Sequence, residues 1–111
     1  MRAFAVYALP VSEKYGKPVL VTEAGFPDYD GANLNPSLYD FTGKVLDFNE
    51  QVMAFEALFQ VLSSLDWVEG VFPFVWAFKS DYNYQIEDWP ISNDLRLKPA
   101  ADVIRVWFAG E

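Results

Sequence analysis

The sequence predicts an α/β fold in which two consecutive βα units contribute neighbouring parallel strands. Two short apolar runs, Val19–Thr22 and Val71–Phe78, lack the polar alternation of a half-exposed strand, and this is typical of strands buried on both faces of a parallel sheet. A long polar loop follows each run, and a segment with helical spacing of apolar residues follows each loop. Strands alternating with helices in this way indicate βα units.

The first unit begins with the end of a helix. Residues 11–17 finish with Gly16, which suits the left-handed position after a last helical turn, and Pro18 prevents continuation. Pro10 argues against a long helix upstream. The strand at Val19–Thr22 follows directly and ends on the carboxylate of Glu23.

Residues 26–48 are predicted to form one long loop, because prolines, glycines, Asp and Asn are dense there. The helix after this loop starts at an acidic variant of the capping box, Asp47-x-x-Glu50. Its apolar residues are spaced three and four apart, as expected for a helix that packs on one face. They are Val52, Phe55, Leu58, Phe59, Leu62 and Leu65.

The second unit repeats this order. Pro73 cannot donate to a strand ladder, so it belongs at the strand entry or at a bulge, and the regular strand is expected over Phe74–Phe78. Residues 79–97 form the second long loop, and Pro99 opens the last helix at its first-turn position. The apolar face of that helix comprises Ala100, Val103, Ile104, Trp107 and Phe108.

Composition narrows the possible functions. The 111 residues suit one modest domain, and 8 basic against 16 acidic side chains give a net charge of -8, which repels phosphate backbones and anionic lipid headgroups. We therefore expect no nucleic acid and no membrane among its partners. Because the chain has no Cys and no His, thiol nucleophiles, Ser-His-Asp triads and imidazole or thiolate metal sites are excluded within it. Chemistry would depend on carboxylates, Tyr, Lys or Ser, and no cofactor motif is present.

Glu23 is the main candidate for chemistry. A carboxylate at the C-terminal end of a buried strand is costly unless it is paired or used. The residues around it leave two interpretations open: a functional acid, or a partly exposed acid hydrogen-bonded to a neighbouring loop.

Three segments, 15–26, 70–78 and 97–105, together resemble the end of a clan A glycoside hydrolase of the cellulase, mannanase and β-galactosidase superfamily. The resemblance implies the last two βα units, strands 7 and 8, of a TIM (β/α)₈ barrel. It implies that Glu23 is the nucleophile of a retaining enzyme acting on β-linked sugars. It also implies that Trp76 forms a platform for the sugar. Trp89 and Tyr82, in the second loop, are further candidates for sugar contacts.

A complete barrel needs at least about 200 residues, so residues 1–111 are interpreted as a single partial domain. The family places the acid/base Glu at the end of the fourth strand, and no such segment is present. We therefore expect the isolated chain to be inactive. The loop acids are expected to shape turns rather than replace the missing acid; they are Asp28, Asp30, Asp81, Glu87, Asp88 and Asp94.

Two alternatives remain open. The chain could be a noncatalytic module that binds carbohydrate through Trp76 and Trp89, or an interaction module derived from such a barrel. Because two βα units leave open sheet edges and bare apolar faces, we also expect either a missing N-terminal barrel segment or self-association as a partner.

Overall fold

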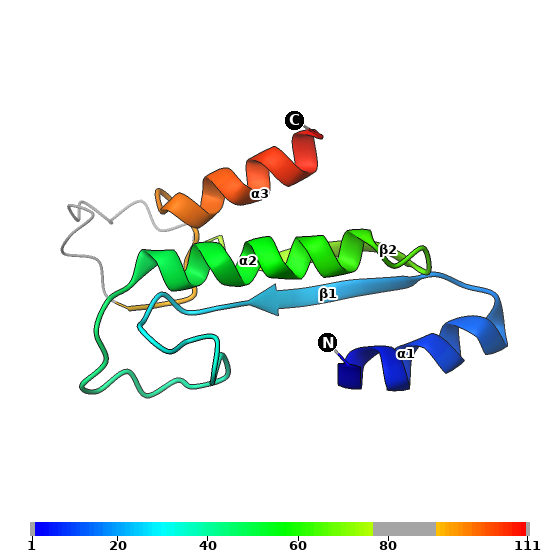
Figure 1. Ribbon diagram of the computed structural model, residues 1–111, viewed down its shortest axis with the longest axis horizontal. Helices are drawn as coiled ribbons and strands as arrows, with labels where there is room; N and C mark the ends of the chain where they lie inside the picture. The colour runs from blue at the N-terminus through cyan, green and yellow to red at the C-terminus, as the bar shows by residue number, and fades with distance from the viewer. Residues whose placement is uncertain (1, 77–90, 111) are drawn as a thin grey trace.

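The structure is a computed structural model that describes residues 2–76 and 91–110. Five elements follow one another along these residues (Figure 1). They are α1 (Arg2–Tyr15), β1 (Val19–Gly25), α2 (Phe48–Ser63), β2 (Val68–Phe74) and α3 (Pro99–Ala109). The strands pair in parallel, and a helix follows each of them, so the expected α/β class and the two βα units are confirmed.

Helix α1 continues through Pro10, so the prediction that no long helix precedes this residue was wrong. A proline inside a helix loses one hydrogen bond and crowds the preceding turn, and here the remaining turns hold the helix despite that cost. Its end was predicted correctly. Gly16 has a φ of 59°, and the Ser12 hydroxyl donates to the Lys17 carbonyl oxygen at 2.6 Å.

An irregularity in β1 determines which side chains face the helices. Val21 pairs with Val71 and Ala24 pairs with Pro73, so β1 carries one residue more than β2 across this interval. Such a bulge shifts the alternation of side chains by one position. Val21 and Ala24 accordingly both pack against the core, whereas Thr22 and Glu23 are exposed.

Strand β2 begins earlier than the sequence suggested. It covers Val68–Phe74, and the expected strand over Phe74–Phe78 was wrong for Val75 and Trp76, which form no strand; residues 77 and 78 lie outside the described ranges. Pro73 lies within the strand, beside the β1 bulge. The ladder is already irregular there, so a residue without an N–H is tolerated.

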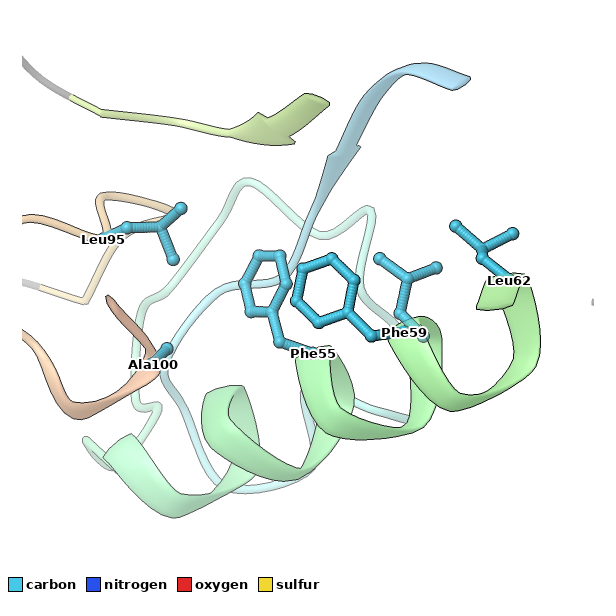
Figure 2. Close-up of a cluster of buried hydrophobic side chains, with 6 residues drawn as sticks. Phe55, Phe59, Leu62, Leu95 and Ala100 are labelled. Carbon is cyan, nitrogen blue, oxygen red and sulfur yellow. The ribbon is translucent and has the colours of Figure 1, made fainter. Parts of the chain in front are cut away.

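The core forms where α2 meets α3 and the sheet. Figure 2 shows Phe55, Phe59 and Leu62 projecting from α2 toward the strands, with Leu95 and Ala100 at one end of the cluster. The helix begins as predicted, because the Asp47 side chain accepts hydrogen bonds from the N–H groups of Asn49 and Glu50. The predicted apolar residues belong to or pack against the core, although Leu65 lies beyond the end of α2 at Ser63.

Helix α3 begins at Pro99, as predicted, and ends at Ala109, followed by Gly110 as a C-cap residue in the left-handed conformation. Four of its five predicted apolar residues belong to or pack against the core, whereas Phe108 is exposed apart from an edge contact with Phe59. The Trp107 indole N–H donates to Glu56 at 2.9 Å, which ties α3 to α2. Within residues 2–76 and 91–110, no helix is long and apolar enough to span a membrane.

Candidate functional site

Glu23 lies near the C-terminal end of β1, inside the bulge. Without the extra residue, the alternation that buries Val21 would turn Glu23 toward the same core. With it, the carboxylate is exposed on solvent. Among the described residues, none donates a hydrogen bond to it. The interpretation of Glu23 as an acid held by a neighbouring loop therefore finds no support in this part of the chain.

The two strand ends approach each other closely beyond Glu23. Gly25 pairs with Phe74, and a Cβ atom on Gly25 would lie 2.4 Å from the Phe74 carbonyl oxygen. Real side chains essentially never come that near, so glycine is needed here for space. The end of β1 thus packs tightly against the end of β2.

Trp76 follows two residues after the end of β2, and its side chain is 49% exposed. The backbone beside it is fixed, because Val75 donates to the Asn93 carbonyl oxygen at 3.2 Å and accepts from the Leu95 N–H at 2.9 Å. No ring among the described residues stacks on Trp76.

The structure places Glu23 and Trp76 toward the same end of the parallel sheet, where β1 and β2 lead into their loops. It does not join them by a direct contact within the described ranges. Trp89 and Tyr82, the other predicted sugar contacts, lie outside the described residues, as do Asp81, Glu87 and Asp88.

A buried ion pair joins the two loops at this end of the sheet. The Lys98 ammonium lies 2.6 Å from Asp28 Oδ2, and both side chains are 0% exposed. The Ser92 N–H donates to Asp28 Oδ1 at 2.7 Å, and Lys98 Nζ donates to the Ser92 hydroxyl at 3.0 Å. Sequence reasoning took Asp28 for a loop acid and did not pair it, because the partners are 70 positions apart and no local pattern relates them.

Two further acids, Asp94 and Glu50, have structural partners. Asp94 is buried and accepts from the Arg96 N–H at 3.1 Å, as expected of a turn-forming acid. Glu50 lies in the first turn of α2 and accepts from the Asn33 N–H at 3.4 Å.

Three carboxylates gather at the start of α2. Oxygens of Asp30, Asp47 and Glu50 lie within 4.8 Å of one another. The N-cap role of Asp47 accounts for its place, and negative charge in a first helical turn is favourable.

Asp40 is a separate acid in the middle of the first loop, and it is exposed. Hydrogen bonds from the hydroxyl and N–H of Thr42 lower the pKa of Asp40.

Solved structures resemble this chain over most of its length. Two matched structures are described as a β-1,4-mannanase of glycoside hydrolase family 113 and a complex of such an enzyme. Their TM-scores are 0.75 and 0.72, each at 27% identity over 93% of this chain. The chain spans 33% of the length of each. No curated protein matches the chain significantly.

The family comparison covers most of the sequence. The model of Glycoside Hydrolase Family 113 matches residues 5–94, a range that includes Glu23, the first loop, both strands and Trp76. The sequence resemblance to a clan A glycoside hydrolase is thereby confirmed, and this chain belongs to Glycoside Hydrolase Family 113.

Proposed function

We propose that this chain supplies the nucleophile side of a retaining glycoside hydrolase site, with Glu23 as the attacking carboxylate. The observation that carries the proposal is the β1 bulge, which exposes Glu23 near the strand's C-terminal end. In (β/α)₈ barrels that end of the strands carries the active site. A paired strand holds the backbone of Glu23 in place. This suits a nucleophile, because small misplacements of a reacting atom lower the reaction rate by large factors.

The chemistry would proceed in two steps. The Glu23 carboxylate attacks the anomeric carbon while a second carboxyl group protonates the leaving oxygen, giving a covalent glycosyl-enzyme. Water activated by the same second group then displaces Glu23. Retention requires the two carboxyl groups about 5 to 5.5 Å apart. The second group is expected in a segment that this sequence does not contain.

For the substrate we propose a β-1,4-linked mannan or manno-oligosaccharide. Support comes from the two structural neighbours, whose descriptions name that activity. Trp76 would form a sugar platform, since a half-exposed indole offers a flat apolar face with a polar N–H at its edge. In this proposal β1 and β2 correspond to strands 7 and 8 of the barrel.

A labelling experiment tests the nucleophile. The chain is produced with the remainder of a family barrel, fused or coexpressed, and treated with a 2-deoxy-2-fluoro mannoside that accumulates the covalent intermediate. Peptide mass spectrometry should find the label on Glu23, and Glu23→Gln should abolish both labelling and turnover. Glu69→Gln is the matched control, because Glu69 is also an exposed strand glutamate. Label on another residue would refute the assignment.

The same proposal predicts that the 111-residue chain alone hydrolyses no aryl mannoside above the buffer rate. Without a second carboxyl group at the right distance, neither protonation of the leaving group nor activation of water is provided. Turnover by the isolated chain that Glu23→Gln removes would contradict the need for a missing acid/base.

A second candidate function is carbohydrate binding without catalysis. It is favoured by the exposure of Trp76, which is 49%. Titration of the isolated chain with mannohexaose, followed by tryptophan fluorescence, distinguishes it from the first candidate. Saturable binding that Trp76→Ala removes would support a binding module, and no binding would favour the enzyme half-site.

The expected partner is the rest of the barrel. On the face of the sheet not covered by the core, Leu20 is 50% and Phe72 57% exposed. An apolar groove of about 260 Å³ also lies among α2, β2 and α3. Exposed apolar surface of this kind usually marks an interface. Size-exclusion chromatography should therefore show self-association of the chain alone, relieved by coexpression with the N-terminal barrel part.

A further inference from the structure

We infer that Asp28 and Lys98 are a positioning pair, which fixes Trp76 relative to Glu23 by clamping both strand ends to the segment 92–95. The inference builds on the proposed function, because it assigns these residues a role in that same site. Neither Asp28 nor Lys98 needs to touch the sugar for this role.

The clamp reaches the Trp76 side through the backbone. Ser92, which donates to Asp28 and accepts from Lys98, directly precedes Asn93. The next residues hold Val75 on both sides, by the bonds from Val75 N to Asn93 O and from Leu95 N to Val75 O. Val75 is covalently joined to Trp76. Moving segment 92–95 must therefore move the base of the Trp76 side chain.

The clamp reaches the Glu23 side through the first loop. Asp28 lies five residues after Glu23, and its own N–H donates to the Ser92 carbonyl oxygen at 3.3 Å. Its carbonyl oxygen accepts from the Asp47 N–H at 2.9 Å, which ties it to the start of α2. The close approach of Gly25 to Phe74 restricts movement of the chain between the bulge and Asp28. Both ends of the site thus depend on one buried junction, formed by Asp28, Ser92 and Lys98.

The charges explain why the junction has a single arrangement. Lys98 is the N-cap residue of α3 and makes no capping hydrogen bond with its side chain. A cation at a helix N-terminus is opposed by the helix dipole, and a buried ammonium is costly without an anion. Asp28 supplies that anion. Because the Asp28 carboxylate is buried against Lys98 and the Ser92 N–H, the first loop cannot move away from these residues without exposing or stranding that carboxylate.

The test follows the environment of Trp76 directly by ¹⁹F NMR of the chain labelled with 5-fluorotryptophan. Each resonance is assigned by a single Trp→Phe substitution. The doubly neutral variant Asp28→Asn/Lys98→Met is used because it removes both charges of the pair together, and circular dichroism verifies that it retains the fold. The Trp76 resonance should shift by more than its linewidth or broaden, while that of Trp67, which directly precedes β2, stays in place.

Two further variants separate charge pairing from general damage. Lys98→Arg keeps a cation opposite Asp28 and should leave the Trp76 resonance close to its original position. Asp102→Asn removes an acid from an exposed pair with Arg105, and it should leave the Trp76 resonance unchanged. A folded doubly neutral variant with an unshifted Trp76 resonance would overturn the inference.

In the reconstituted barrel, the doubly neutral variant keeps Glu23 and Trp76. Its kcat should nevertheless be at least tenfold lower than that of the wild type. Lys98→Arg should recover most of that loss. If the reconstituted wild type shows no glycosidase activity, the proposed function fails, whereas the ¹⁹F result still decides the positioning role. A doubly neutral variant with unchanged kcat in an active barrel would contradict the link to catalysis.

Discussion

Gly25 lies against Phe74 so closely that an added Cβ atom would sit 2.4 Å from the Phe74 carbonyl oxygen and 3.1 Å from its ring. The nearest obstacle is backbone, which cannot rotate away. We expect Gly25→Ala to force the strand ends apart and to lower the free energy of unfolding by about 1 to 3 kcal/mol, the usual range for overpacking. Urea unfolding followed by circular dichroism measures it.

Gly70→Ala is the matched control for this prediction. It lies in the same sheet, and its added Cβ would meet the end of the Leu20 side chain at 3.2 Å. A flexible side chain can shift by that small amount, so the change in unfolding free energy should stay within about 0.5 kcal/mol, typical of a tolerated substitution. Equal losses from both variants would contradict the close-approach argument.

The cap at Asp47 should carry measurable stability. Its carboxylate accepts from the N–H groups of Asn49 and Glu50 at 2.9 and 3.4 Å. Asp47→Ala leaves both donors without this partner and should cost about 1 kcal/mol of unfolding free energy. Asp66→Ala, at an exposed loop position, should cost little. Thermal unfolding of the two variants tests the difference, and equal melting temperatures would refute the cap.

The features that could be predicted from sequence are those governed by neighbouring residues. Asp47 and Pro99 mark helix starts because capping and first-turn preferences act within a few positions. The stripe containing Phe55 and Phe59 needs only the helical period. Glu23 was located through the end of an apolar run, although that run continues as a strand to Gly25.

The missed features depend on contacts between distant segments. The β1 bulge is a mismatch in residue count between two strands, which neither strand reveals alone. Asp28 and Lys98 form their pair only once both loops fold over the sheet end. Pro10 shows the opposite error, since a local rule against proline in helices was applied where the helix persists.

The first loop offers a test by pH. Hydrogen bonds from the Thr42 hydroxyl and N–H, with a smaller contribution from Lys44, lower the pKa of Asp40 below its ordinary 3.8. Because the folded-state pKa is depressed, the stabilisation of this turn is present above the unfolded pKa and is lost as pH falls through the folded value. Thr42→Val removes the hydroxyl but keeps the N–H, so the pKa of Asp40 should rise partway toward 3.8. An NMR titration of the carboxyl carbon measures it.

Lys44→Met is the companion variant for this titration. The charge of Lys44 makes a smaller contribution than either Thr42 bond, so its removal should raise the pKa of Asp40 less than Thr42→Val does. Added salt should reproduce much of the Lys44→Met effect by screening. A larger rise for Lys44→Met than for Thr42→Val would show that charge, not hydrogen bonding, controls this carboxyl group.

The effect of replacing Phe72 should depend on the chain's state of assembly, whereas the effect of replacing Phe55 should not. Phe55 is 0% exposed in the core, and Phe55→Ala should cost about 3 to 5 kcal/mol whether or not other barrel segments are present. Phe72 is 57% exposed, so Phe72→Ala should change the stability of the isolated chain little and reduce its self-association. In a reconstituted barrel the same variant should become costly, because Phe72 would then be buried. Denaturant unfolding of both variants in both states tests this, and an equally mild effect of Phe72→Ala in the reconstituted barrel would mean that its face is not an interface.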